Sequence, residues 1–142
     1  MLLMLLPEQL DKYWPLLKYV IENTFPRNVV VSSTLMNNIL EALLNGSMQA
    51  WIYVIGEDTI VASLITSIYK DPVIKTKGLK IYCLYSFEPL SKENWVSGAN
   101  TLYKFAKSEE CDLLEGYSTN EAIIKQGKEF NWSIETRLYK EI

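Results

Sequence analysis

The chain has 142 residues, which suits one domain (1–142), and its 49% hydrophobic and 22% charged residues are typical of a globular protein. The net charge of −3 disfavours a nucleic-acid-binding protein, because binding to phosphates rests on clustered Lys and Arg. The sequence has no histidine, so it lacks the commonest zinc ligand and the usual general base. We therefore expect no metal site and no nucleic-acid partner.

Cysteine usage and the apolar start bear on where the protein works. Cys83 and Cys111 are too few for the disulfide framework of a small secreted protein. The apolar run 1–6 is too short for a signal peptide, and Pro7 ends it. No stretch approaches the roughly 20 apolar residues of a membrane span. These features predict a cytoplasmic protein without a membrane partner.

The first half of the chain predicts one strand, two helices and a hairpin. Apolar residues at helical spacing indicate the helices, and Pro15 marks either a kink or the first turn of the main helix. Ser32 to Thr34 supply the cap of the second helix, and Asn45-Gly46 ends it. The predicted elements are a strand over 2–6, helices over 8–24 and about 34–45, and strands over 49–55 and 59–69.

The second half predicts three strands alternating with two helices. Leu79, Ile81, Cys83, Tyr85 and Phe87 alternate, so we expect them on one face of a strand, with Tyr82, Tyr85 and Phe87 in the core. Ser91 caps the long helix, and Thr119 or Asn120 caps the last one. The predicted elements are a strand over 79–88, a helix to about 110, a buried strand over 112–118, a helix ending near 130, and a half-buried strand over 132–138.

The order of these elements resembles that of the Gcn5-related N-acetyltransferases (GNAT) over nearly the whole chain. Residues 106–115 look like the family's helix-to-strand step, 120–123 like the start of its following helix, and 130–132 like the turn before its last strand. The resemblance implies an α/β (α+β) fold, with a mixed sheet of about six strands flanked by four helices. The sequence also looks like small GNAT-like proteins of tailed phages, which implies a phage origin and a place in the virion.

The residues that hold the cofactor in that family are mostly replaced. Members bind the pyrophosphate of acetyl-CoA on an Arg/Gln-x-x-Gly-x-Gly/Ala loop, because glycine lets a phosphate reach the backbone at a helix N-terminus. The matching positions are Leu90, Glu93 and Trp95, and we expect the Trp95 indole to fill part of the cofactor cleft. Lys92 and Asn120 remain as candidate cofactor-binding residues. The resemblance therefore implies no cofactor, or acetyl-CoA if the protein is active.

Catalytic groups are equally sparse. The tyrosine that protonates the leaving thiolate in many members matches Gly127 here. Glu88, at the end of a strand, matches a glutamate that deprotonates the amine through water in some relatives, although a solvated strand end explains it equally well. The first hypothesis is therefore a GNAT-fold binding or assembly module with a protein partner or self-association. The alternative is a divergent acyl-CoA-dependent N-acetyltransferase using Glu88.

Overall fold

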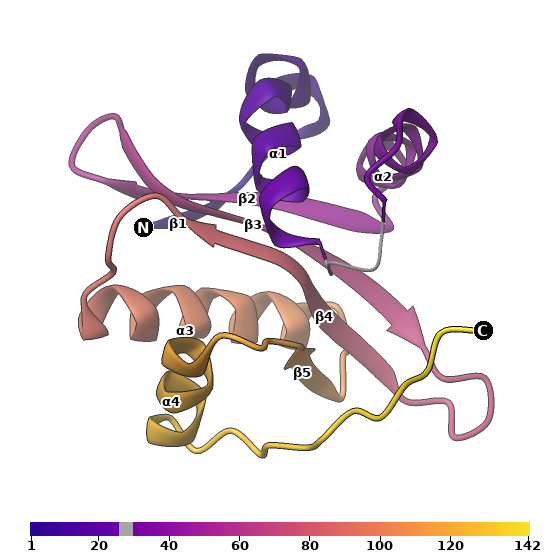
Figure 1. Cartoon of the computed structure of the whole chain (residues 1–142). Helices are drawn as coiled ribbons and strands as arrows, with labels where there is room; N and C mark the ends of the chain where they lie inside the picture. Colours follow the sequence, from indigo (N-terminus) through magenta and orange to yellow (C-terminus); the bar gives the residue numbers. More distant parts are fainter. Residues whose placement is uncertain (26–29) are drawn as a thin grey trace.

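One mixed sheet organises the fold (Figure 1). The computed structural model describes residues 1–25 and 30–142, which form five strands in the order β1-β2-β3-β4-β5. The first four strands pair antiparallel, and β5 pairs parallel with β4. Their bounds are β1 (Leu2–Met4), β2 (Met48–Ile55), β3 (Thr59–Lys70), β4 (Lys77–Ser86) and β5 (Leu113–Gly116).

Helices lie on both faces of this sheet (Figure 1). They are α1 (Leu10–Thr24), preceded by a short 3-10 turn over Pro7–Gln9, α2 (Ser33–Asn45), α3 (Lys92–Ser108) and α4 (Glu121–Glu129). On one face, here the α1 face, Leu17 and Ile21 of α1 and Ile39 of α2 pack against Ile65 of β3. On the other, the α3 face, Leu102 packs with strand residues that include Trp51, Tyr53 and Leu64. The α+β fold class is thus confirmed, with five strands and four α-helices among the described residues.

The predicted helix caps are confirmed. The Ser32 hydroxyl accepts the N–H of Leu35 at the start of α2, and Gly46 ends that helix with φ 84°. The Ser91 hydroxyl accepts the N–H of Asn94 at 3.1 Å, which caps α3. Each side chain satisfies a backbone donor that the helix itself leaves free. Pro15, by contrast, lies inside α1 and not in its first turn.

A buried polar chain joins β2 to β3 on the α3 face. The Trp51 Nε1–H donates to Thr66 Oγ1 at 2.9 Å, and the Thr66 hydroxyl donates to Gln49 Oε1 at 2.8 Å. The Gln49 amide then donates to the carbonyl of Gly46 at 2.9 Å. All three side chains are buried, and each is paired, so none carries the cost of an unmade hydrogen bond.

A β-bulge changes the orientation of side chains along β4. Cys83 lies opposite Ile65 and Ile81 lies opposite Thr66, so Tyr82 is an extra residue without a partner in β3. The bulge interrupts the alternation. As a result Ile81 packs on the α3 face and Cys83 on the α1 face. The prediction that the alternating residues of 79–87 share one face is therefore wrong.

The C-terminal part differs from the prediction in two ways. Residues 132–138 form no strand, because in the described chain they find no sheet partner for their alternating pattern. The strand predicted over 112–118 is only four residues long, and it is not buried, since Leu113 is 38% exposed. Both differences arise because a strand forms only where the fold supplies a neighbouring strand, and an alternation of apolar and polar residues does not specify that neighbour.

Candidate functional site

The sheet splits where β5 ends. β5 pairs with Gly78 to Ile81 of β4 and stops at Gly116, while β4 continues from Tyr82 to Ser86 with no partner on that side among the described residues. We call this region the β4–β5 split. The two strands are thus parallel neighbours along β5 and lose their pairing beyond Gly116.

Backbone groups of β4 are available at the split. The N–H of Phe87 donates to the carbonyl of Val61 in β3 at 2.8 Å. The backbone groups of Phe87, and of every second residue before it as far as the bulge, therefore point toward β3. Because successive residues of a strand point their backbone groups to opposite sides, Leu84 and Ser86 face the split. A ligand that carries amide groups could pair with them as an added strand does.

The first turn of α3 is fixed from the sheet. The hydroxyl of Tyr53 on β2 donates to Asn94 Oδ1 at 3.2 Å. Gly98 lies directly over the Tyr53 ring, since a Cβ there would be 3.6 Å from Tyr53 Cε2. Tyr53 is buried, so the start of this helix is held firmly against β2.

This first turn does not fit a pyrophosphate in the way that a glycine loop does. The Ser91 hydroxyl takes the N–H of Asn94, and the N–H of Trp95 donates to the Ser91 carbonyl at 3.0 Å. Of the turn's backbone donors, those of Lys92 and Glu93 remain, and Glu93 places a carboxylate beside them. A carboxylate is stabilised at this end of the helix dipole, but it repels a phosphate. An acyl-CoA pyrophosphate would meet one lysine and one opposing charge here.

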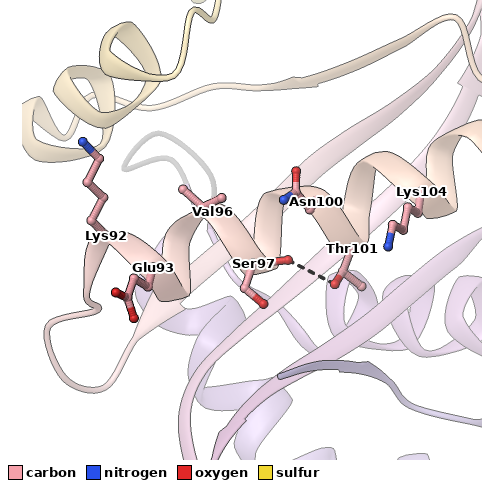
Figure 2. Close-up of a pocket in the computed structure, with 7 residues that line it drawn as sticks. All are labelled: Lys92, Glu93, Val96, Ser97, Asn100, Thr101 and Lys104. Carbon is pink, nitrogen blue, oxygen red and sulfur yellow. Dashed lines mark hydrogen bonds between the residues drawn. The ribbon is translucent and has the colours of Figure 1, made fainter.

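The candidate residues Lys92 and Asn120 are not brought together. The Lys92 ammonium points toward α4 and lies 6.0 Å from the centre of the Phe130 ring, at the C-terminal end of that helix (Figure 2). Asn120 caps the opposite end of α4, which spans nine residues, or about 14 Å at a rise of about 1.5 Å per residue. The Asn120 Oδ1 accepts the N–H groups of Ala122 and Ile123, so it is used as a helix cap.

Glu88 lies in a bend just after β4, with its side chain exposed. Its backbone carbonyl accepts the Ser86 hydroxyl, which folds the chain back at this point. The carboxylate is therefore near the end of the strand whose backbone faces the split, where a base could reach a ligand through water. Both interpretations of Glu88 agree with this position, a solvated residue at the end of a strand and a catalytic base.

An aromatic cluster beside Glu88 was not predicted. Tyr19 of α1 contacts Tyr85 at 5.4 Å between ring centres and stacks near Phe87 at 6.2 Å. The hydroxyls of Tyr19 and Tyr85 are 3.3 Å apart, and this hydrogen bond raises the pKa of Tyr85. Phe87 is 41% exposed and Tyr82 is 43% exposed, so the expectation that these rings lie in the core is wrong. Helical spacing places Tyr19 on the outer side of α1, but no local signal brings it to β4.

Two open hollows lie along α3, and neither includes Glu88 or Asn120. The larger, of about 730 Å³, runs along the outer surface of the helix, where Thr101 Oγ1 donates to the Ser97 carbonyl (Figure 2). The smaller, of about 450 Å³, lies between α3 and the turn after α4. The larger is lined by Lys92, Glu93, Val96, Ser97, Asn100, Thr101 and Lys104.

Trp95 and Cys83 offer no catalytic group. Trp95 is half-buried, whereas Leu102 and Ala106 of the same helix are buried, so the indole is less enclosed than expected. Burial raises the pKa of the Cys83 thiol to about 11, which makes it a poor nucleophile. Among the described residues, no group of three or more Cys, Asp or Glu side chains could hold a metal ion, and no helix is long and apolar enough to cross a membrane.

The structure is similar to solved acetyltransferases, although no protein-family model and no curated protein matches the sequence. A probable acetyltransferase superposes with a TM-score of 0.72 at 12% identity, over 100% of this chain and 95% of that one. Ribosomal-protein-alanine N-acetyltransferase from Brucella melitensis biovar Abortus 2308 gives 0.69 at 13% identity, over 100% and 99%.

A predicted acetyltransferase from Clostridium acetobutylicum, solved with acetyl-CoA, gives a TM-score of 0.70 at 15% identity, over 100% of this chain and 94% of that one. At such low identities the likeness concerns the fold and not the activity. The match nevertheless covers this whole chain in each case. The chain has a GNAT-like fold.

Proposed function

We propose that this chain is a GNAT-fold domain that has lost acetyl-CoA-dependent catalysis and acts as a binding or assembly module for a protein partner. The first turn of α3 carries the proposal. Ser91 uses its hydroxyl to cap the helix, Glu93 adds a carboxylate, and Lys92 turns toward Phe130. Each arrangement stabilises the helix or its neighbour and weakens an anion site.

A second argument comes from the wide separation of the candidate groups. Lys92 and Asn120 lie at opposite ends of α4, and Asn120 is used as a cap. A catalytic site needs its binding and reacting groups in one fixed arrangement. An origin among tailed phages, with a place in the virion, stays a prediction from the sequence.

Thermal unfolding in the presence of acetyl-CoA tests this proposal. A ligand that binds only the native state at about 100 times its Kd adds roughly 2.7 kcal/mol to the free energy of unfolding. We expect millimolar acetyl-CoA to leave the melting temperature of this protein unchanged. Differential scanning fluorimetry or calorimetry would show the shift if it occurred.

Two charge reversals on α3 serve as matched variants. Lys92→Glu removes the cation nearest the helix start, and Lys104→Glu removes one farther along the same outer surface. If acetyl-CoA raises the melting temperature and Lys92→Glu alone abolishes the rise, the chain binds the cofactor at the helix start and the proposal fails.

The β4–β5 split favours a second candidate, a divergent acyl-CoA-dependent N-acetyltransferase. The backbone groups of Leu84 and Ser86 face the split, and Glu88 follows at its end. This candidate requires Glu88 to act as the base. An amine-dependent release of CoA thiol that Glu88→Gln abolishes, with an unchanged melting temperature, would establish it over the first.

A further inference from the structure

β1 forms an open edge of the sheet (Figure 1). In the part of the chain that the structure describes, β1 pairs with β2 alone, and β5 forms the opposite edge. At about 4.8 Å from strand to strand, the two edges are about 19 Å apart. The C-terminal segment lies on the β5 side, where the Arg137 guanidinium is 5.4 Å from the centre of the Tyr117 ring. A free strand edge is a template for another strand.

The hydrogen bonds of β1 show which of its backbone groups are free. The N–H of Leu5 donates to the carbonyl of Ala50 at 2.8 Å, so the backbone of Leu5 faces β2. Backbone groups alternate along a strand, so Leu3 also faces β2. The N–H and C=O groups of Leu2 and Met4 therefore point outward, away from β2.

The side chains at this edge are apolar and partly exposed. Residues 1–6 contain no charged side chain, although edge strands are commonly protected by one. Leu3 is 38% exposed, Met4 is 42% exposed and Leu6 is 50% exposed. The backbone of Leu6 is occupied, because its N–H donates to Gln9 Oε1 and its carbonyl accepts the N–H of Gln9. The open edge is thus confined to the three residues of β1.

This open edge is complementary to itself. Leu2 and Met4 stand on either side of Leu3, so a two-fold axis at Leu3 places Leu2 of each copy opposite Met4 of the other in an antiparallel pair. Every outward N–H then donates to an outward C=O of the other copy. A two-fold axis at Leu2 or at Met4 pairs only part of these groups, because it places the remaining residue beyond the open edge of the other copy. The free groups therefore specify one register and an identical strand as the partner.

We propose that two copies of this chain associate through β1, which joins their sheets into one continuous sheet about a two-fold axis at Leu3. The two Leu3 residues then face each other at about 4.5 Å between Cα atoms, and each covers the exposed side chain of the other. Such a contact uses the same surface on both copies and closes without forming a fibre. Because each copy contributes only a three-residue strand, the association should be weak and reversible. It goes beyond the proposed function, since it does not depend on whether the domain binds acyl-CoA.

Charge substitutions at Leu3 test the association, because this residue meets its own copy. In sedimentation velocity, the unchanged protein, with any purification tag at its C-terminus, should shift from monomer to dimer as its concentration rises. Leu3→Lys and Leu3→Glu should each stay monomeric, because like charges then meet at the axis. An equimolar mixture should form a dimer again, because lysine then faces glutamate. Leu138→Lys, at an exposed apolar residue on the β5 side, is the matched control and should dimerise like the unchanged chain.

Met4→Pro tests the backbone pairing itself. Proline removes the outward N–H of Met4, whereas the bonds to β2 come from Leu3 and Leu5. This variant should keep a melting temperature close to that of the unchanged chain and should stay monomeric.

Thermal unfolding of each variant separates a lost contact from a lost fold. A mixture of folded Leu3 variants that stays monomeric, a folded Met4→Pro chain that dimerises, or a monomeric Leu138→Lys chain would each overturn the association through β1. An unchanged chain that is monomeric at every concentration would also overturn it and would leave the edge to a different strand.

Discussion

The region from β1 to β4 and the region from α3 to the C-terminus are packed very differently. In the first, strands β2 and β3 are covered on both faces, and side chains such as Leu17, Ile21 and Ile65 are fully enclosed. In the second, β5 is short and half-exposed, and α4 contributes no buried residue. The hydrophobic effect scales with the apolar area removed from water, so most of the stability lies in the first region. The second is free to carry recognition.

A pair of tryptophans compares the two regions through the packing of a large side chain. Trp51 of β2 is 3% exposed and its N–H is hydrogen-bonded, so Trp51→Ala should lower the free energy of unfolding by about 3–5 kcal/mol. Trp95 of α3 is half-buried, so Trp95→Ala should cost roughly half as much. Urea unfolding of both variants measures the difference. Equal losses would mean that the start of α3 is as tightly packed as the sheet.

Two threonines compare the regions through hydrogen bonding. Thr66 joins Trp51 to Gln49 inside the core, and Thr66→Val leaves a buried donor and a buried acceptor unpaired, at a cost of about 1–3 kcal/mol each. Thr101 is bonded only to the carbonyl of Ser97 in its own helix, on an open surface, so Thr101→Val should change stability by less than about 0.5 kcal/mol. Chemical denaturation of the two variants would sharpen the comparison, and a costly Thr101→Val would break it.

The smallest effect concerns how the free energy of unfolding depends on pH, through Tyr69 at the boundary between the two regions. Burial, together with the carboxylate of Glu115, raises the pKa of Tyr69 from 10.0 to about 12. The folded protein therefore holds this proton more tightly than the unfolded chain does. The free energy of unfolding should fall as the pH rises from 10 towards about 12, and should be unaffected by this group below 10. Tyr69→Phe should remove this part of the alkaline loss, which thermal unfolding at several pH values would reveal.

Local features were predictable from the sequence, and long-range ones were not. Ser32, Ser91 and Asn120 cap their helices as predicted, because a cap depends on residues two or three positions away. The bulge at Tyr82 depends on the register between β3 and β4, which no alternation within β4 specifies. For the same reason the strand predicted over 132–138 finds no partner in the described chain.

The same difference between local and long-range features applies to the candidate site. The mismatch at Glu93 was predicted from sequence, since a carboxylate in the first turn of a helix opposes a phosphate wherever the helix lies. The separation of Lys92 from Asn120 depends on how α4 packs against α3, and the approach of Tyr19 to Tyr85 on how α1 crosses the sheet. Those contacts join residues far apart in the chain.

The bulge makes Tyr82 a residue that β4 holds in excess of its partner strand. Tyr82 is 43% exposed, so many side chains should be tolerated at this position. Deleting the position should preserve the register, because Ile81 and Cys83 would then be direct neighbours that still lie opposite Thr66 and Ile65. Each following residue of the strand would keep its present face, with Cys83 toward α1. A single-codon deletion at position 82 should thus be tolerated far better than the deletion of a paired residue of the same strand, which would turn every residue beyond it to the other face.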